Sequence, residues 1–125
     1  MGIIQGLVGH ATSVDLESIE EEYRPLLVRD EKILSAHKFV RDMIVFTSHR
    51  VITMEAQGIT GRKKSFTSIP YHSIIKFSKE SAGWADYDAE LRIWVRGESQ
   101  PIKWEFRKSE AVNDIFRILS EGVLT

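Results

Sequence analysis

The sequence predicts a mainly β domain: a seven-stranded antiparallel sandwich or partly open barrel, capped by a C-terminal α-helix. Two observations lead to this prediction. From Ile33 onward, apolar residues recur with a period of two and β-branched and aromatic residues dominate, which is typical of strands with one buried face. Near the C-terminus the period changes to that of an amphipathic helix, and its apolar stripe can close the open end of such a sheet.

Length and composition limit the possible classes of protein. A chain of 125 residues fits one domain with a substantial core, and 42% hydrophobic residues are typical of globular proteins. The 17 basic and 18 acidic residues give no overall field that would attract nucleic acid, so we predict no nucleic-acid partner. The chain has no cysteine, which is typical of a reducing compartment, and we expect a cytoplasmic protein. The sequence indicates neither a signal peptide nor a transmembrane segment.

Residues 1–30 are predicted to form a helical extension that precedes the domain at residues 31–125. Thr12 and Ser13 are candidate N-caps, and acidic residues follow them as the positive end of a helix favours. The helix should end just before Pro25. Its apolar stripe comprises Leu16, Ile19, Tyr23 and Leu26. We therefore expect this helix to pack on another surface, and regard the N-terminal third as additional to a sheet that begins at residue 33.

Seven short strands are predicted after this extension. They span Ile33–Val40, Met43–Thr47, Arg50–Glu55, Lys63–Ile69, Ile74–Lys79, Ala89–Val95 and Gln100–Arg107. Because most of the intervening segments are short, consecutive strands should pair as antiparallel hairpins in a meander. A final helix follows, with Ser109 as its N-cap and Gly122 as its C-terminal stop. Its apolar stripe comprises Val112, Ile115, Phe116 and Leu119.

Four stretches carry a family resemblance. They are Phe46-Thr47-Ser48-His49-Arg50-Val51-Ile52, Gly58-Ile59-Thr60-Gly61-Arg62-Lys63-Lys64, Ser68-Ile69-Pro70-Tyr71-His72-Ser73-Ile74 and Ala82-Gly83-Trp84-Ala85-Asp86-Tyr87-Asp88-Ala89-Glu90-Leu91. In these stretches the sequence resembles the bacterial pleckstrin-homology (PH) family. The resemblance implies a partly open sandwich capped by the C-terminal helix, and ring-like homo-oligomers.

Eukaryotic relatives of this family often bind phosphoinositides through basic residues on the first two strands, in a Lys-then-Lys/Arg-x-Arg arrangement. The corresponding region here has Lys38 and Arg41 but lacks the Arg-x-Arg end. Arg62, Lys63 and Lys64 form a run of three basic residues at the third hairpin, which we expect at the same end of the fold. These five residues are a candidate anion site, since Arg and Lys donate charge-assisted hydrogen bonds. The alternative is a solvated hairpin tip that protects a sheet edge.

No catalytic or metal-binding constellation is evident. The four histidines are scattered over different elements, and no nucleophile elbow or phosphate-binding glycine loop is present. Asp86, Asp88 and Glu90 begin like a calcium loop, but Leu91 occupies the position where that loop needs glycine. We therefore predict a protein that is not an enzyme and that uses no cofactor and no metal.

Apolar residues outside the expected core provide a candidate oligomer interface. Trp94 lies on the polar face of its strand between Arg92 and Arg96, and exposed aromatics are enriched at interfaces. The alternative is that a crossing side chain, for example one from the N-terminal helix, covers Trp94. The candidate interface residues are Ile3, Ile4, Leu7, Trp84, Tyr87 and Trp94. The leading hypothesis is a self-assembling binding or scaffold protein with a possible protein partner; the other is a peripheral module that binds anionic lipid or another anionic ligand.

Overall fold

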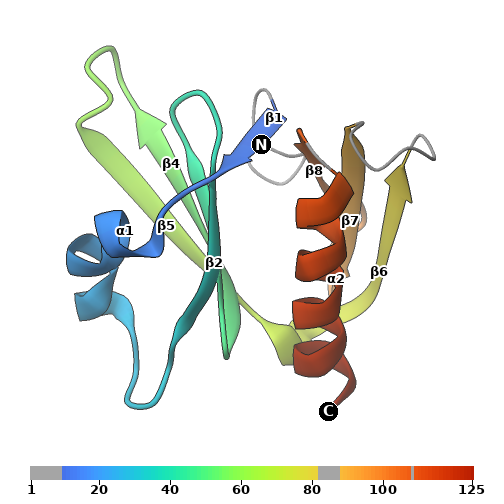
Figure 1. Ribbon diagram of the computed structural model, residues 1–125. Helices are drawn as coiled ribbons and strands as arrows, with labels where there is room; N and C mark the ends of the chain where they lie inside the picture. Colours follow the sequence, from blue (N-terminus) through green and yellow to red (C-terminus); the bar gives the residue numbers. More distant parts are fainter. Residues whose placement is uncertain (1–9, 82–87, 108) are drawn as a thin grey trace.

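The computed structural model describes residues 10–81, 88–107 and 109–125. Within these ranges, eight strands form one strongly curled sheet with the order β5-β4-β3-β2-β1-β8-β7-β6 (Figure 1). The strands are β1 (His10–Ser13), β2 (Ile33–Lys38), β3 (Met43–Thr47), β4 (Arg50–Gln57), β5 (Lys63–Pro70), β6 (Ile74–Ser81), β7 (Ala89–Val95) and β8 (Ile102–Phe106). The helices are α1 (Leu16–Tyr23) and α2 (Ser109–Leu124), and the short 3-10 turns are η2 (Arg24–Leu26) and η3 (Tyr71–Ser73).

The predicted fold class is confirmed. Every predicted strand is present, and the strands from β2 to β5 and from β6 to β8 pair with their sequence neighbours as antiparallel hairpins. The three-residue turn η3 joins the two edge strands, β5 and β6, at one end of the open side of the barrel. Strand β7 alternates as expected, with Leu91 and Ile93 fully buried and Arg92 and Trp94 facing outward. In β7, period-two patterning therefore predicted both the strand and the face that it buries.

Strand β1 is the main departure from the prediction, because the sheet has eight described strands where seven were predicted. It runs parallel to β8, with Ala11 opposite Phe106, and antiparallel to β2, with Thr12 opposite Lys38. It thereby joins the two halves of the sheet, which would otherwise meet at unpaired edges. Four residues are too few to show a period of two. Thr12 and Ser13, the predicted helix caps, lie in this strand.

Helix α1 begins two residues later than predicted, with Asp15 as its N-cap. The Asp15 carboxylate accepts a hydrogen bond from the Glu17 N–H at 3.2 Å, which satisfies one of the free donors of the first turn. The helix then packs its buried residues, Ile19 and Tyr23, on the outer face of β2 to β4. The helix therefore packs on another surface, as expected, and that surface is the sheet itself; Leu26, the last residue of the predicted stripe, is 37% exposed.

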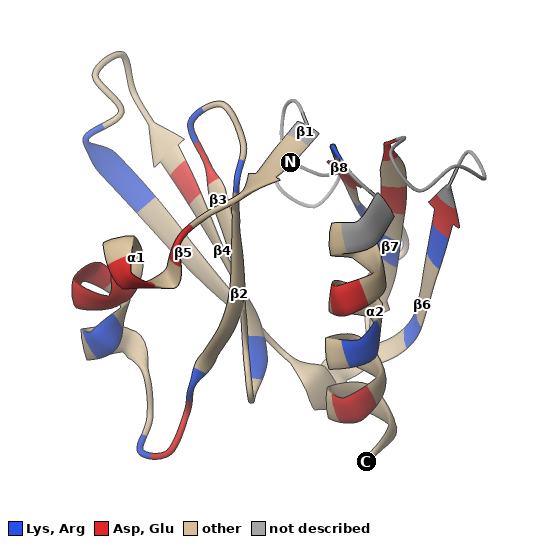
Figure 2. Ribbon diagram, viewed as in Figure 1, with Lys and Arg blue, Asp and Glu red and all other residues tan. Residues whose placement is uncertain are grey.

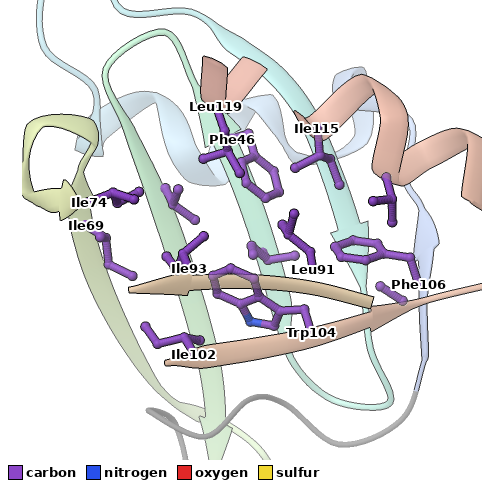
Figure 3. Packing of buried hydrophobic residues seen from close by; sticks show 14 of the residues in the cluster. Phe46, Ile69, Ile74, Leu91, Ile93, Ile102, Trp104, Phe106, Ile115 and Leu119 are labelled. Atoms are coloured by element: carbon purple, nitrogen blue, oxygen red, sulfur yellow. The ribbon is translucent and has the colours of Figure 1, made fainter. Parts of the chain in front are cut away.

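Two cores share strand β3. The inner core lies between the sheet halves and α2, and Figure 3 shows Phe46 and Trp104 packed between them. The outer core lies under α1 and includes Met43 and Val45. All five residues of β3 are buried, because its two faces contact different cores. This explains why the strand is a continuous apolar run and does not alternate with polar residues.

Helix α2 does not stop at Gly122 but continues to Leu124. Gly122 instead allows a close approach to the ring of Tyr71, since a Cβ at this position would lie 2.4 Å from Tyr71 Cδ2. The Tyr71 hydroxyl in turn donates to the Thr47 carbonyl oxygen at 2.6 Å. The glycine therefore serves packing between α2 and η3, and the prediction of a helix stop is wrong.

Candidate binding surfaces

The turns of the β2–β3 and β4–β5 hairpins lie at the same end of the molecule (Figure 1). Arg41 connects them, because its Nη2 donates to the Gly58 carbonyl oxygen at 2.6 Å. Gly61, with a φ of 72°, leaves room for this guanidinium, since a Cβ there would lie 3.2 Å from Arg41 Nη2. The structure therefore brings the two basic segments of the predicted anion site to one end of the fold (Figure 2).

The basic residues at this end differ in whether an acidic side chain already compensates their charge. All five of the predicted residues, Lys38, Arg41, Arg62, Lys63 and Lys64, are exposed. Lys64 Nζ donates to Glu22 Oε2 of α1 at 2.7 Å, so an acidic residue already compensates its charge. Acidic groups are interspersed here, and Asp42 accepts a hydrogen bond from the Ala56 N–H at 2.8 Å. Arg62 and Lys63 are thus the residues best placed to contact an anion.

Trp94 lies on the outer face of β6, β7 and β8, where it is half-buried. Lys76 is its cross-strand neighbour, and Lys76 Nζ lies 4.3 Å from the centroid of the Trp94 ring, a cation–π contact. Helix α1 packs on the opposite half of the sheet and therefore does not cover Trp94 (Figure 1). The other predicted interface residues, Ile3, Ile4, Leu7, Trp84 and Tyr87, lie outside the described residues.

Ion pairs surround Trp94 on this outer face. Arg92 Nη2 lies 2.9 Å from Glu90 Oε1, and Lys103 Nζ lies 3.5 Å from Glu90 Oε2. All three side chains are partly exposed. Exposed pairs of this kind contribute little to stability, because solvent screens them. Ile75, in the irregular segment beside Lys76, is 60% exposed. The outer face of β6 to β8 therefore carries a half-buried tryptophan among charged side chains of both signs.

A buried polar cluster, which the sequence analysis did not find, lies at the opposite end of the sheet from the basic hairpin tips. The Glu31 carboxylate accepts hydrogen bonds from Thr47 Oγ1 at 2.6 Å and from Arg50 Nε at 2.8 Å. Burial by itself would raise the Glu31 pKa. It is outweighed by the hydrogen bonds from Arg50, Thr47 and the Val28 N–H, together with the positive charge of Arg50, so the Glu31 pKa falls to about 2. This cluster is a structural anchor, as its polar atoms already satisfy one another.

Another buried polar residue, His37, lies between two aromatic rings. Phe106 and Phe46 approach it edge-on, with centroid distances of 5.2 and 6.0 Å. Burial lowers the His37 pKa to about 4, although the charge of Asp114 acts in the opposite direction. Within the described ranges, no group of three His, Cys, Asp or Glu residues is arranged to hold a metal ion.

Comparison with known families identifies the fold. The family model described as Bacterial PH domain matches residues 2–123, almost the whole chain. This chain belongs to the bacterial PH domain family. The match includes both the N-terminal residues and the strands from β2 onward, and it agrees with the curled sheet and its capping helix.

Individual relatives match this chain along almost their whole length. The chain is 46% identical over 121 residues to the uncharacterized protein YjqA of Bacillus subtilis (strain 168), covering 96% of this chain and 97% of that protein. A crystal structure of a DUF1696 family protein with a PH domain from Shewanella loihica PV-4 matches with a TM-score of 0.81 and 36% identity, over 92% of this chain and 98% of the other. A PH domain from Shewanella amazonensis SB2B matches with a TM-score of 0.70 and 40% identity, over 94% of both chains.

In the part of the chain that the structure describes, no helix is both long and apolar enough to span a bilayer.

Proposed function

We propose that this PH-family chain is a non-catalytic binding or scaffold protein that acts through homo-oligomerisation and contacts with other proteins. The observation that carries the proposal is Trp94, a large aromatic that is only half-buried on the outer face of its sheet strand. Tryptophan is among the residues most enriched at the energetic centre of protein interfaces. PH domains are in general binding modules, so a contact surface, rather than an internal catalytic site, agrees with the family.

The position of a second apolar patch supports a head-to-tail contact between copies. Leu26 and Val28, which follow α1, are 37% and 57% exposed. Leu26 lies beside the half of the sheet that contains β2 to β5, since its carbonyl oxygen accepts a hydrogen bond from Arg50 of β4, whereas Trp94 lies on the half that contains β6 to β8. A contact between two different patches of identical subunits is heterologous, and it forms a ring when the rotation closes.

Replacing Trp94 by Ala is expected to weaken self-association by about thirtyfold, the effect of losing a hot-spot side chain worth about 2 kcal/mol. Sedimentation velocity over a concentration series measures this dissociation constant. Ile59→Ala is the matched control, since Ile59 is fully exposed on the β4–β5 hairpin, away from both patches. A wild-type protein that remains monomeric at tens of micromolar would contradict the proposal.

The second candidate function is binding of an anionic lipid through the basic hairpin tips. The hydrogen bond between Arg41 and Gly58 favours it, because it holds the two basic segments together. Cosedimentation with phosphatidylserine vesicles tests it, with phosphatidylcholine vesicles as the uncharged comparison. Reversing both Arg62 and Lys63 to Glu should weaken binding by thirtyfold or more, at about 1 kcal/mol for each basic residue lost near the surface.

The control for this experiment makes the same change of charge elsewhere. Lys103 on β8 and Arg117 on α2 are exposed and lie outside the hairpin tips. Changing both of them to Glu should leave vesicle binding close to that of the wild type if the hairpin tips are the site. Equal binding to neutral and anionic vesicles would show that the basic hairpin tips are not the basis of lipid binding.

A further inference from the structure

Two exposed aliphatic residues lie in the turns of the β2–β3 and β4–β5 hairpins. Ile59, in the β4–β5 turn, is fully exposed, and Val40, in the β2–β3 turn, is 71% exposed. Among the other large hydrophobic residues that the structure describes, only Leu124, the last residue of α2, matches the exposure of Val40. Single exposed aliphatic residues are common on proteins, but here two of them occupy neighbouring hairpin tips at one end of the molecule (Figure 1).

The conformation of the two turns requires neither side chain. The β2–β3 turn is closed by a hydrogen bond of 2.8 Å from the Phe39 N–H to the Asp42 carbonyl oxygen, with Val40 between them. In the β4–β5 turn, two glycines with φ values of 80° and 72° supply the left-handed conformations on either side of Ile59. Turns favour Gly, Asn, Asp and Pro, whereas Val and Ile favour strands. An aliphatic residue exposed in both turns therefore indicates a contact surface.

A hydrogen bond holds the two tips beside each other. Arg41, the sequence neighbour of Val40, donates through Nη2 to the carbonyl oxygen of Gly58, the sequence neighbour of Ile59, at 2.6 Å. Each aliphatic residue is thus directly next to a member of this hydrogen-bonded pair. The two tips therefore form one surface with two aliphatic residues at neighbouring positions, and not two independent loops.

Basic residues lie immediately behind the aliphatic ones. Figure 2 shows that the outermost part of the β4–β5 hairpin carries no charge and that basic residues follow it at the start of β5. Arg62 and Lys63 lie there, Lys38 and Arg41 flank the other tip, and all four are exposed. Apolar residues outermost with cations next to them match the layers of an anionic bilayer, in which acyl chains lie beneath negative headgroups.

We propose that Val40 and Ile59 insert below the headgroups of an anionic bilayer, while the neighbouring Lys and Arg side chains contact the headgroups. This inference rests on the second candidate function, the binding of anionic lipid by the basic hairpin tips, and adds a second contribution to that binding. Salt screens the attraction between charges, whereas the burial of aliphatic surface does not depend on charge. The two contributions can therefore be measured separately.

Cosedimentation with phosphatidylserine vesicles measures the contribution of the two side chains. Changing both Val40 and Ile59 to Ser should weaken binding by roughly tenfold to a hundredfold, the effect of losing the partial burial of two aliphatic side chains. Both side chains are exposed, so the free protein should keep its fold. Leu124→Ser is the matched control, because it removes an equally exposed aliphatic side chain at the far end of the molecule (Figure 1). It should change binding by less than about twofold.

A fluorescent label at position 59 tests insertion directly. The chain has no cysteine, so Ile59→Cys provides a single attachment site for the environment-sensitive fluorophore NBD. On phosphatidylserine vesicles, the NBD emission should shift to shorter wavelengths and should be quenched by lipids that carry a nitroxide on the acyl chain. The same label in a His49→Cys variant, in the exposed β3–β4 turn at the opposite end of β4, should show neither change.

These measurements distinguish insertion from the lipid binding on which it rests. If the Val40→Ser/Ile59→Ser variant binds as tightly as the wild type, or if the label at position 59 stays unquenched on bound protein, insertion is overturned and binding through charge alone stands. A loss of binding that Leu124→Ser reproduces would also overturn insertion by the tips. Absence of wild-type binding to phosphatidylserine vesicles would overturn both and favour an acidic protein as the partner of the tips.

Discussion

Replacing Glu31 by Gln is expected to lower the free energy of unfolding by about 3 kcal/mol at pH 7, the lower end of the effect of breaking a buried ion pair. The Glu31 side chain is completely buried and lies 2.8 Å from Arg50 Nε. Its two carboxylate oxygens accept four hydrogen bonds, from Val28, Thr47 and twice from Arg50. The amide nitrogen of Gln can donate but not accept, so it would face donors and leave the Arg50 charge uncompensated.

The position of this cluster explains why the loss should be large. Arg50 also donates to the Leu26 carbonyl oxygen and, at 2.9 Å, to Ser68 Oγ. It therefore ties the end of η2 and strand β5 to the β3–β4 turn. Tyr71 joins the same turn through its hydrogen bond to the Thr47 carbonyl oxygen. Losing Glu31 would weaken the attachment of the N-terminal segment to the sheet, besides leaving a charge without its partner.

Urea unfolding at a fixed protein concentration measures this effect. Glu21→Gln is the matched control, since Glu21 is an exposed carboxylate on α1 and its loss should change stability by less than 0.5 kcal/mol. The Glu31 pKa is lowered in the folded state, so its stabilisation is complete above pH 4.5 and is lost as the pH falls towards 2. A Glu31→Gln variant within 0.5 kcal/mol of the wild type at pH 7 would show that this cluster is not an anchor.

The sequence predicted the parts of this fold that depend on local periodicity. In β7 and β8 the alternation of Leu91 and Ile93 with Arg92 and Trp94 indicated the correct inner and outer faces. Strand β1 was missed because only pairing with β2 and β8 defines it, and four residues carry no period. Gly122 was taken for a helix stop because its real constraint, the Tyr71 ring, lies about fifty residues away in the sequence.

The candidate sites show the same division between local and long-range information. The outward position of Trp94 followed from alternation, but its contact with Lys76 depends on the register of β6 against β7. The Glu31–Arg50 pair joins residues 19 positions apart, which no local pattern connects. The Thr53 hydroxyl resembles that of any strand threonine in the sequence. Only the curled and paired sheet shows that this hydroxyl is buried and has no hydrogen-bond partner among the described residues.

Between pH 6.5 and pH 4 the wild-type protein is expected to lose about 3 kcal/mol of stability through His37 alone, as each unit of pKa difference corresponds to about 1.4 kcal/mol. His37 is 3% exposed, and its Nδ1 has no hydrogen-bond partner in the described part of the chain. Its Nε2 lies 3.2 Å from Ser35 Oγ. Because burial lowers the folded-state pKa to about 4, the unfolded chain binds the proton more readily, and falling pH favours unfolding.

Urea midpoints at pH 7, 5.5 and 4 for the wild type and His37→Phe test this expectation. Phenylalanine fills a similar volume between Phe46 and Phe106 but cannot take up a proton, so the variant should lose much less stability over this range. His72→Gln, at an exposed position, is the matched control and should follow the wild-type profile. The pH range over which His37 changes the stability lies above the range for Glu31, whose stabilisation is lost only as the pH falls below about 4.5. A profile for His37→Phe as steep as that of the wild type between pH 6.5 and 5 would therefore assign the acid sensitivity to a different group.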